Sequence, residues 1–146
     1  MRSSAFKKRF GRSYVAILLS LSSLPLAGHD ATMLDAMPSK HGGRVRMAGP
    51  FHVELVLSNT PPSSKSAPIW VYLQNHSFED VSAKALAVTI DFIDGTRTTS
   101  AVLQQKGFNL FFGSGVYKIT PTLQVNVQLK SGAGAFTAEF NPFEAH

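Results

Sequence analysis

The 146-residue chain contains no cysteine. This absence excludes disulfide bonds, thiolate catalysis, all-cysteine zinc sites and iron–sulfur clusters. A metal site in this chain must therefore use His, Asp, Glu, Met or backbone ligands. The stability of the fold must come from an apolar core, because no covalent cross-link is available.

The chain also lacks an excess of positive charge beyond its first twelve residues. Five of its fourteen Lys and Arg residues lie there, at Arg2, Lys7, Lys8, Arg9 and Arg12. The remainder carries nine Lys and Arg residues against nine Asp and Glu residues, so it is about neutral. No basic patch indicates binding to nucleic acid.

The basic start is followed by a short apolar stretch, "YVAILLSLSSLPLAG", at residues 14–28. A basic segment, an apolar segment and a small-residue exit are typical of a secretory signal peptide. The apolar run is shorter than the roughly 20 residues that a membrane span needs. We predict a signal peptide over residues 1–28, a mature chain that begins between residues 28 and 32, and a periplasmic location without a membrane span.

No window of the sequence has the periodicity of an amphipathic helix, whereas period-two alternation recurs from Val45 onward. Residues 29–40 show no periodicity and predict a flexible leader. The alternating segments are separated by turn residues such as Asp94-Gly95 and Ser131-Gly132. This spacing predicts an all-β domain over residues 41–142, an immunoglobulin-like antiparallel β-sandwich; a small β-barrel is the alternative.

The strands expected from this alternation are short. They cover "FHVELVL" (51–57), "IWVYLQ" (69–74), "ALAVTIDFI" (85–93), "RTTSAVLQ" (97–104), "FNLFF" (108–112), "VYKI" (116–119), "TLQVNVQL" (122–129) and "GAFTAEF" (134–140). The apolar strand at 69–74 is expected to be central in its sheet. Leu123, Val125, Val127 and Leu129 are expected to point inward.

Enzyme signatures are absent from the sequence. The "GSG" at residues 113–115 is not the Gly-x-Ser-x-Gly of a nucleophile elbow, and it predicts a turn. The "GAG" at residues 132–134 lies between two expected strands, whereas a dinucleotide-binding loop opens a helix. We therefore predict a non-catalytic protein with no catalytic residues.

The histidines suggest a metal site. His52 and Glu54 are two apart on an expected strand, so they share a face about 6.5–7 Å apart along it. Imidazole nitrogen and carboxylate oxygen both bind transition metals. His41 could reach over that face through a turn at Gly42-Gly43, and His76 could supply a fourth ligand. The alternative is an exposed polar pair at His52 and Glu54 and a turn residue at His76.

Three further residues bear on copper. Met37 and Met47 lie near this group, and their soft sulfur atoms would suit Cu(I). If cleavage follows Gly28, His29 becomes the N-terminal residue, whose amine and ring nitrogen could together chelate copper.

The stretch "HGGRVRMAGPFHVELVL", followed by "IWVYL", "ALAVTIDF", "GFNLFF" and "GAFTAEF", resembles a small periplasmic domain of heavy-metal handling systems. This domain is similar to the N-terminal module of some heavy-metal efflux adaptor (membrane fusion) proteins, and it also occurs as stand-alone exported proteins. Such sequences open with His-Gly-Gly, continue into a strand with an acidic residue, and then have a Val-Tyr strand. The resemblance covers residues 37–140. It implies a role for His41 and for Glu54 at the acidic position; His52 and His76 match only some members.

Two functions follow as hypotheses. The first is a periplasmic protein that binds, buffers or delivers copper or zinc in metal resistance, with His41, His52, Glu54 and His76 as candidate ligands. The second is a non-catalytic module that docks on an efflux adaptor or another envelope protein without binding metal. Convergence of three of the four side chains would favour the first hypothesis. Protons compete for imidazole, so metal binding should weaken below the free-histidine pKa of about 6.5.

Overall fold

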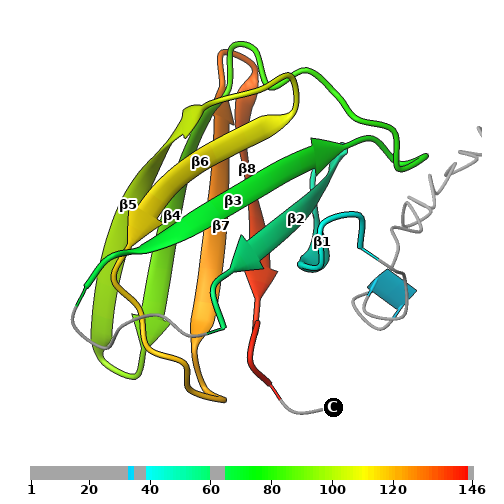
Figure 1. The fold of residues 1–146 in the computed structure, drawn as a ribbon. Helices are drawn as coiled ribbons and strands as arrows, with labels where there is room; N and C mark the ends of the chain where they lie inside the picture. Colours follow the sequence, from blue (N-terminus) through cyan, green and yellow to red (C-terminus); the bar gives the residue numbers. More distant parts are fainter. Residues whose placement is uncertain (1–32, 35–38, 60–64, 145–146) are drawn as a thin grey trace, which may run out of the picture.

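A computed structural model describes residues 33–34, 39–59 and 65–144, and the elements that it defines there are eight β-strands (Figure 1). They are β1 (Arg44–Ala48), β2 (Phe51–Leu57), β3 (Ala67–Gln74), β4 (Ala87–Asp94), β5 (Arg97–Gln105), β6 (Leu110–Gly115), β7 (Gln124–Ser131) and β8 (Gly134–Phe140). All neighbouring strands pair antiparallel, so the predicted all-β antiparallel class is confirmed. The predicted signal peptide, its cleavage position and most of the leader lie outside the described residues. Within the described ranges, no helix is long and apolar enough to cross a bilayer.

The eight strands form one sheet that curls until its two edges meet (Figure 1). The strand order is β1-β2-β3-β6-β5-β4-β7-β8. Within it, β4, β5 and β6 are successive neighbours, and β3 lies beside β6, which is the arrangement of a Greek key. Only Gln104 and Gln105 of β5 pair with β6, so the two halves face each other as layers. The edge strands β1 and β8 lie against each other. This nearly closed sheet is consistent with both the predicted sandwich and the small-barrel alternative.

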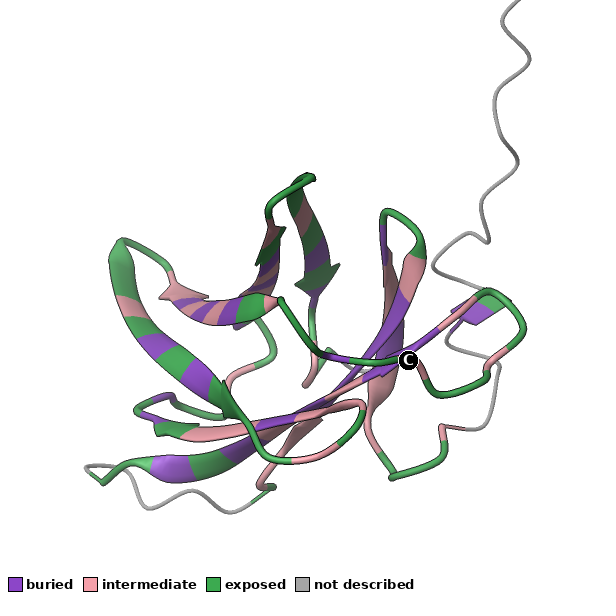
Figure 2. Cartoon of the chain, turned by 90° about the horizontal axis from the view of Figure 1, so that it is seen from above, coloured by how far each residue is buried: buried purple, intermediate pink, exposed green. Residues whose placement is uncertain are grey.

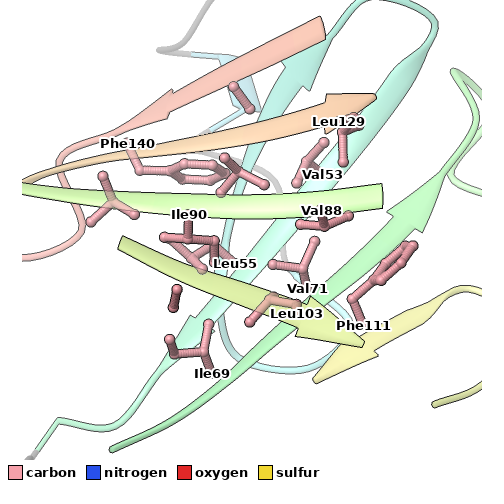
Figure 3. Packing of buried hydrophobic residues seen from close by; sticks show 14 of the residues in the cluster. Val53, Leu55, Ile69, Val71, Val88, Ile90, Leu103, Phe111, Leu129 and Phe140 are labelled. Carbon is pink, nitrogen blue, oxygen red and sulfur yellow. The ribbon is translucent and has the colours of Figure 1, made fainter. Parts of the chain in front are cut away.

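The core lies between the two layers and follows the alternation of the sequence. Figure 2 shows buried and exposed residues succeeding each other along most strands, and Figure 3 shows side chains from both layers meeting in the middle. The expected inward residues on the strand before the last are all buried: Leu123, Val125, Val127 and Leu129. That prediction is confirmed, as is the central position of β3 between β2 and β6.

Two predicted hairpins are confirmed by the pairing. β4 and β5 pair up to Asp94 opposite Arg97, which leaves a two-residue loop that contains Gly95 at φ 60°. β7 and β8 pair up to Ser131 opposite Gly134. A third hairpin, between β1 and β2, was not predicted. Gly49 lies in its turn at φ 57°, and a positive φ favours glycine because glycine has no Cβ atom.

The "GSG" segment is not a turn, and that prediction is wrong. Gly113 and Gly115 continue β6 and pair with Ile69 and Ala67 of β3. A Cβ atom at Gly113 would lie 2.6 Å from Leu103 Cδ2, and one at Gly115 would lie 2.9 Å from Ile69 Cδ1. These glycines therefore permit close packing inside a strand, which sequence alone does not distinguish from a turn.

Candidate functional site

β2 is buried on both of its faces. Val53 and Leu55 face the core, as the alternation predicts, but His52 and Glu54 on the opposite face are only 0% and 1% exposed. The exposed polar pair given as the alternative for His52 and Glu54 is therefore wrong. The segment before β1 and the loop after β3 lie over this face of β2, and their contacts define the candidate site.

The first contact joins His41 to Glu54. Glu54 Oε1 accepts hydrogen bonds from the backbone N–H groups of His41 at 2.8 Å and Gly43 at 3.1 Å, and Glu54 Oε2 lies 2.9 Å from His41 Nδ1. Gly42 adopts φ 79°, which allows the sharp turn that the glycine pair predicts. His41 thus folds back over β2. Both carboxylate oxygens of Glu54 are engaged in holding it.

Tyr72 completes this contact from the neighbouring strand. It pairs with Glu54 across β2 and β3, and its ring stacks on the His41 ring with centroids 3.6 Å apart and planes 3° from parallel. The His41 side chain remains 33% exposed. A carboxylate that fixes one imidazole nitrogen orients the ring and leaves the other nitrogen, Nε2, as the ligand atom, which is a common arrangement around metal-binding histidines.

Gly43 is required at this contact for a different reason from Gly42. A Cβ atom at position 43 would collide with the backbone carbonyl oxygen of Leu55 in β2. The first turn of the chain over β2 therefore depends on the missing side chain, because backbone atoms cannot move aside as a flexible side chain can.

We expect Gly43→Ala to destabilise the fold by about 2 kcal/mol, because it overpacks the contact between this segment and β2. Urea unfolding is the measurement. The matched control is Gly132→Ala, since a Cβ atom at Gly132 meets no atom within 4 Å, and its effect should be within about 0.5 kcal/mol. Equal stability of the two variants would contradict the close approach of Gly43 to β2.

The second contact joins His52 to the loop that follows β3. The ring centroids of His52 and His76 are 5.3 Å apart with planes at 60°, and the ring of Phe78 lies 4.2 Å from that of His52. Phe78 adopts φ 60°, a conformation that costs a bulky residue of order 1–3 kcal/mol and that tends to occur at functional sites. The loop thus holds His76 beside His52 and Phe78 over it.

Asn75 organises this loop. Its Oδ1 accepts from the backbone N–H groups of Ser77 at 2.8 Å and Glu79 at 3.0 Å, and its Nδ2 donates to Glu79 Oε2 at 2.8 Å. The Phe78 N–H donates to the Asn75 carbonyl at 3.0 Å. Such side-chain-to-backbone bonds make an Asx turn, so the position of His76 is set by local structure.

An ion pair ties the loop to the segment before β1. Lys40 Nζ lies 3.0 Å from Asp80 Oδ1, and this hydrogen bond holds the pKa of Asp80 below its usual value, although partial desolvation opposes it. A lowered carboxyl pKa contributes stability that is present above the unfolded value and lost as the pH falls through the folded value. Both side chains are nearly half exposed, so solvent screening keeps this contribution small.

The four predicted ligands therefore form two pairs rather than one cluster, and the convergence of three side chains that would favour the metal hypothesis is not observed among them. His41 pairs with Glu54, and His52 pairs with His76. Among the described residues, no three His, Asp or Glu side chains are grouped to hold a metal ion. Met47 lies opposite His52 in the pairing of β1 with β2, whereas Met37 and His29 lie outside the described residues.

Comparison of the chain with protein-family models, curated proteins and solved structures finds no match. The proposal of a function thus rests on the site and on the sequence features described above.

The sequence did not reveal the aromatic members of the site. Tyr72 reaches His41 only because β2 and β3 pair in one particular register, and the residues 58–66 between these strands do not specify it. Phe78 follows Asn75 in a segment rich in turn-forming residues. That composition was the one signal of a tight loop, which here holds the Phe78 ring against His52. Gln74, buried opposite His52, had no signal beyond its position in the strand.

Proposed function

We propose that this chain is an exported, non-catalytic domain that binds one copper or zinc ion reversibly through His52 and His76. The spacing of the two rings carries the proposal. An imidazole nitrogen binds such a metal at about 2.0–2.1 Å, and it lies about 1.1 Å from its ring centre, so two imidazoles on one tetrahedral ion have centroids about 5.2 Å apart. The observed separation of 5.3 Å accommodates a shared ion, and it also lies within the range of about 4.5–7 Å for ordinary edge-to-face ring contacts, so the titration below decides between the two.

A pair of protein ligands suits delivery better than storage. Structural zinc sites use four protein ligands, whereas sites with fewer protein ligands keep coordination positions open for water or another ligand. Here two positions would remain for water or for a ligand from another protein. Glu54 is committed to His41 and Gly43, so its part in the proposal is to orient His41, whose Nε2 is a further donor on the same side of β2. The periplasmic location and the link to metal resistance rest on the predicted signal peptide and on the resemblance to efflux modules.

Calorimetric titration of the tag-free chain with Zn(II) and Cu(II) tests the proposal. We expect stoichiometric binding that weakens at least tenfold in His76→Ala, because a single imidazole remains, and that weakens as the pH falls because protons compete for the same nitrogens. The electron paramagnetic resonance spectrum of the Cu(II) complex should show coupling to two imidazole nitrogens. His146→Ala is the control and should bind as the unmodified chain does.

The buried position of His52 requires a check on folding. His52→Gln keeps a polar side chain of similar size, and it should lose metal binding while its circular dichroism spectrum stays unchanged. Absence of stoichiometric binding, or binding that is indifferent to both His52 and His76, would reject the metal function.

A specific observation favours the second hypothesis, docking without metal. The His-Gly-Gly turn, the acidic strand residue and the Val-Tyr strand on which the resemblance rests meet in one contact, between His41, Glu54 and Tyr72. That contact has a sufficient structural explanation, because it holds the chain over β2. If metal binding is absent, a module that docks on an efflux or envelope complex is the function that this domain supports.

A further inference from the structure

A second site lies at the other end of β3 from the histidines. A pocket of about 330 Å³ is bounded by β4 and β5 near their hairpin, by the segment after β6 and by Leu123, which precedes β7. In the pairing of β3 with β6, Gly115 lies opposite Ala67 at the beginning of β3, whereas His76 follows the end of that strand. The two ends are well separated in Figure 1, where the hairpin after β4 lies at lower left and the arrowhead of β3 at right.

The floor of this pocket is apolar and closely packed. It is formed by the buried side chains of Phe92, Tyr117 and Leu123. The rings of Phe92 and Tyr117 stack with centroids 4.8 Å apart and planes 16° from parallel. The Tyr117 hydroxyl is bonded to the backbone of Ser58, accepting from its N–H at 2.9 Å and donating to its carbonyl at 3.3 Å. That hydroxyl is thus already satisfied, and the ring presents apolar surface to the pocket.

The rim of the pocket is charged. Arg97 and Lys118 stand on it together with one carboxylate, Asp94. Among the described residues, none of these three side chains forms an ion pair, and the two salt bridges found there involve other residues. The rim therefore carries a net positive charge, from groups that are available to a ligand.

The segment after β6 adds exposed apolar surface at the same place. Val116, which lines the pocket, is 40% exposed, and Ile119 is 43% exposed, with the rim residue Lys118 between them. Thr99 Oγ1 donates to the Val116 carbonyl at 2.7 Å, which fixes this segment against β5. Single exposed apolar residues are ordinary on protein surfaces, but here two of them flank a cation beside an apolar pocket.

We propose that this pocket binds a small amphipathic anion, a molecule with an apolar body and one carboxylate group, of the kind represented by a medium-chain fatty acid. The apolar body lies against the Phe92–Tyr117 stack and Leu123, and the carboxylate lies between Arg97 and Lys118. The pocket volume is at the lower end of the range for small-molecule sites, which limits the ligand to about ten carbon atoms. Charge complementarity selects an anion over a neutral or cationic molecule of the same length. This site is independent of the proposed metal pair.

Titration of the ¹⁵N-labelled, tag-free chain with decanoate, followed by NMR, tests the proposal. We expect saturable shifts at Arg97, Thr99, Val116 and Lys118, and an affinity for decanoate at least tenfold higher than that for decyltrimethylammonium, both below their micellar concentrations. The double variant Arg97→Gln/Lys118→Gln should bind decanoate at least tenfold more weakly. Lys84→Gln/Lys130→Gln removes the same charge from exposed positions outside the pocket, and it should bind decanoate as the unmodified chain does.

Three results would overturn the proposal. They are equal binding of the anion and the cation, shifts that map to the exposed Val102 and Phe108 in place of the pocket, and equal weakening in the two double variants. An additional variant addresses the mouth of the pocket: Val116→Asp introduces a carboxylate there at an already exposed position, so it should abolish decanoate binding without loss of the fold. Retained affinity in that variant would also reject the site.

Discussion

Val127→Asp is expected to unfold the domain. Val127 is fully buried in β7 and lies between Ile90 of β4 and Ala138 of β8. A carboxylate there has no partner and no water, and burial of such a group costs far more than the loss of the apolar side chain. The expected loss is more than about 4 kcal/mol, which is comparable to the whole stability of many domains. Far-UV circular dichroism with urea unfolding measures it.

The matched control is Gln124→Asp on the same strand, because Gln124 is exposed. Its effect should be within about 1 kcal/mol. Gln128, the neighbour of Val127 on the opposite face of β7, is a poorer control. Its Nε2 donates to Asp91 Oδ2 at 2.8 Å, so an aspartate at position 128 would face another carboxylate. Equal melting temperatures of Val127→Asp and Gln124→Asp would show that the register of β7 is wrong.

Glu54→Ala is expected to cost about 3 kcal/mol, because it removes the acceptor of buried hydrogen bonds and leaves a cavity. The substitution leaves the N–H groups of His41 and Gly43 and the ring of His41 without their acceptor. It also empties the volume of a fully buried side chain. Urea unfolding measures the loss, and NMR shifts of the His41 and Tyr72 rings report whether their stacking is lost with it.

Two variants serve as comparisons for Glu54→Ala, and both are expected to lose less stability. Glu54→Gln keeps one carbonyl oxygen for the two backbone donors, so its loss should be smaller than that of the alanine variant. Glu139→Ala removes a carboxylate from an exposed position on β8 and should change stability by less than about 0.5 kcal/mol. If Glu54→Ala were as stable as Glu139→Ala, the three bonds to Glu54 would contribute nothing to the fold.

The parts of the fold that the sequence predicts are those governed by local alternation. Val88 and Ile90, and likewise Val125 and Val127, lie inward because a strand with one apolar face has only one stable orientation. The Asp94-Gly95 hairpin follows from backbone preference at a single glycine. The turn predicted at residues 113–115 is wrong because the glycines there serve packing against Leu103 and Ile69, a long-range requirement with no local signature.

The site could be predicted only in part for the same reason. His41, Glu54, His52 and His76 were identified from residue type and spacing, and the fold of His41 over β2 followed from the glycine pair. Their division into two pairs depends on the register of β2 with β3 and on the Phe78 loop. The burial of His52 and Glu54 depends on what covers β2 from outside, and a period-two pattern carries no information about a second covered face.

The meeting of β1 with β8 has a consequence for folding in the cell. Unpaired strand edges are templates for aggregation, and here each terminal strand of the sheet covers the other. Arg44 at the start of β1 donates to the carbonyl of Pro142, 98 residues later in the chain. The edge of β1 therefore stays exposed until the last strand has been added, and contacts between such distant residues form slowly. A chain without disulfides is then most vulnerable to association with other chains just before its C-terminal strand docks.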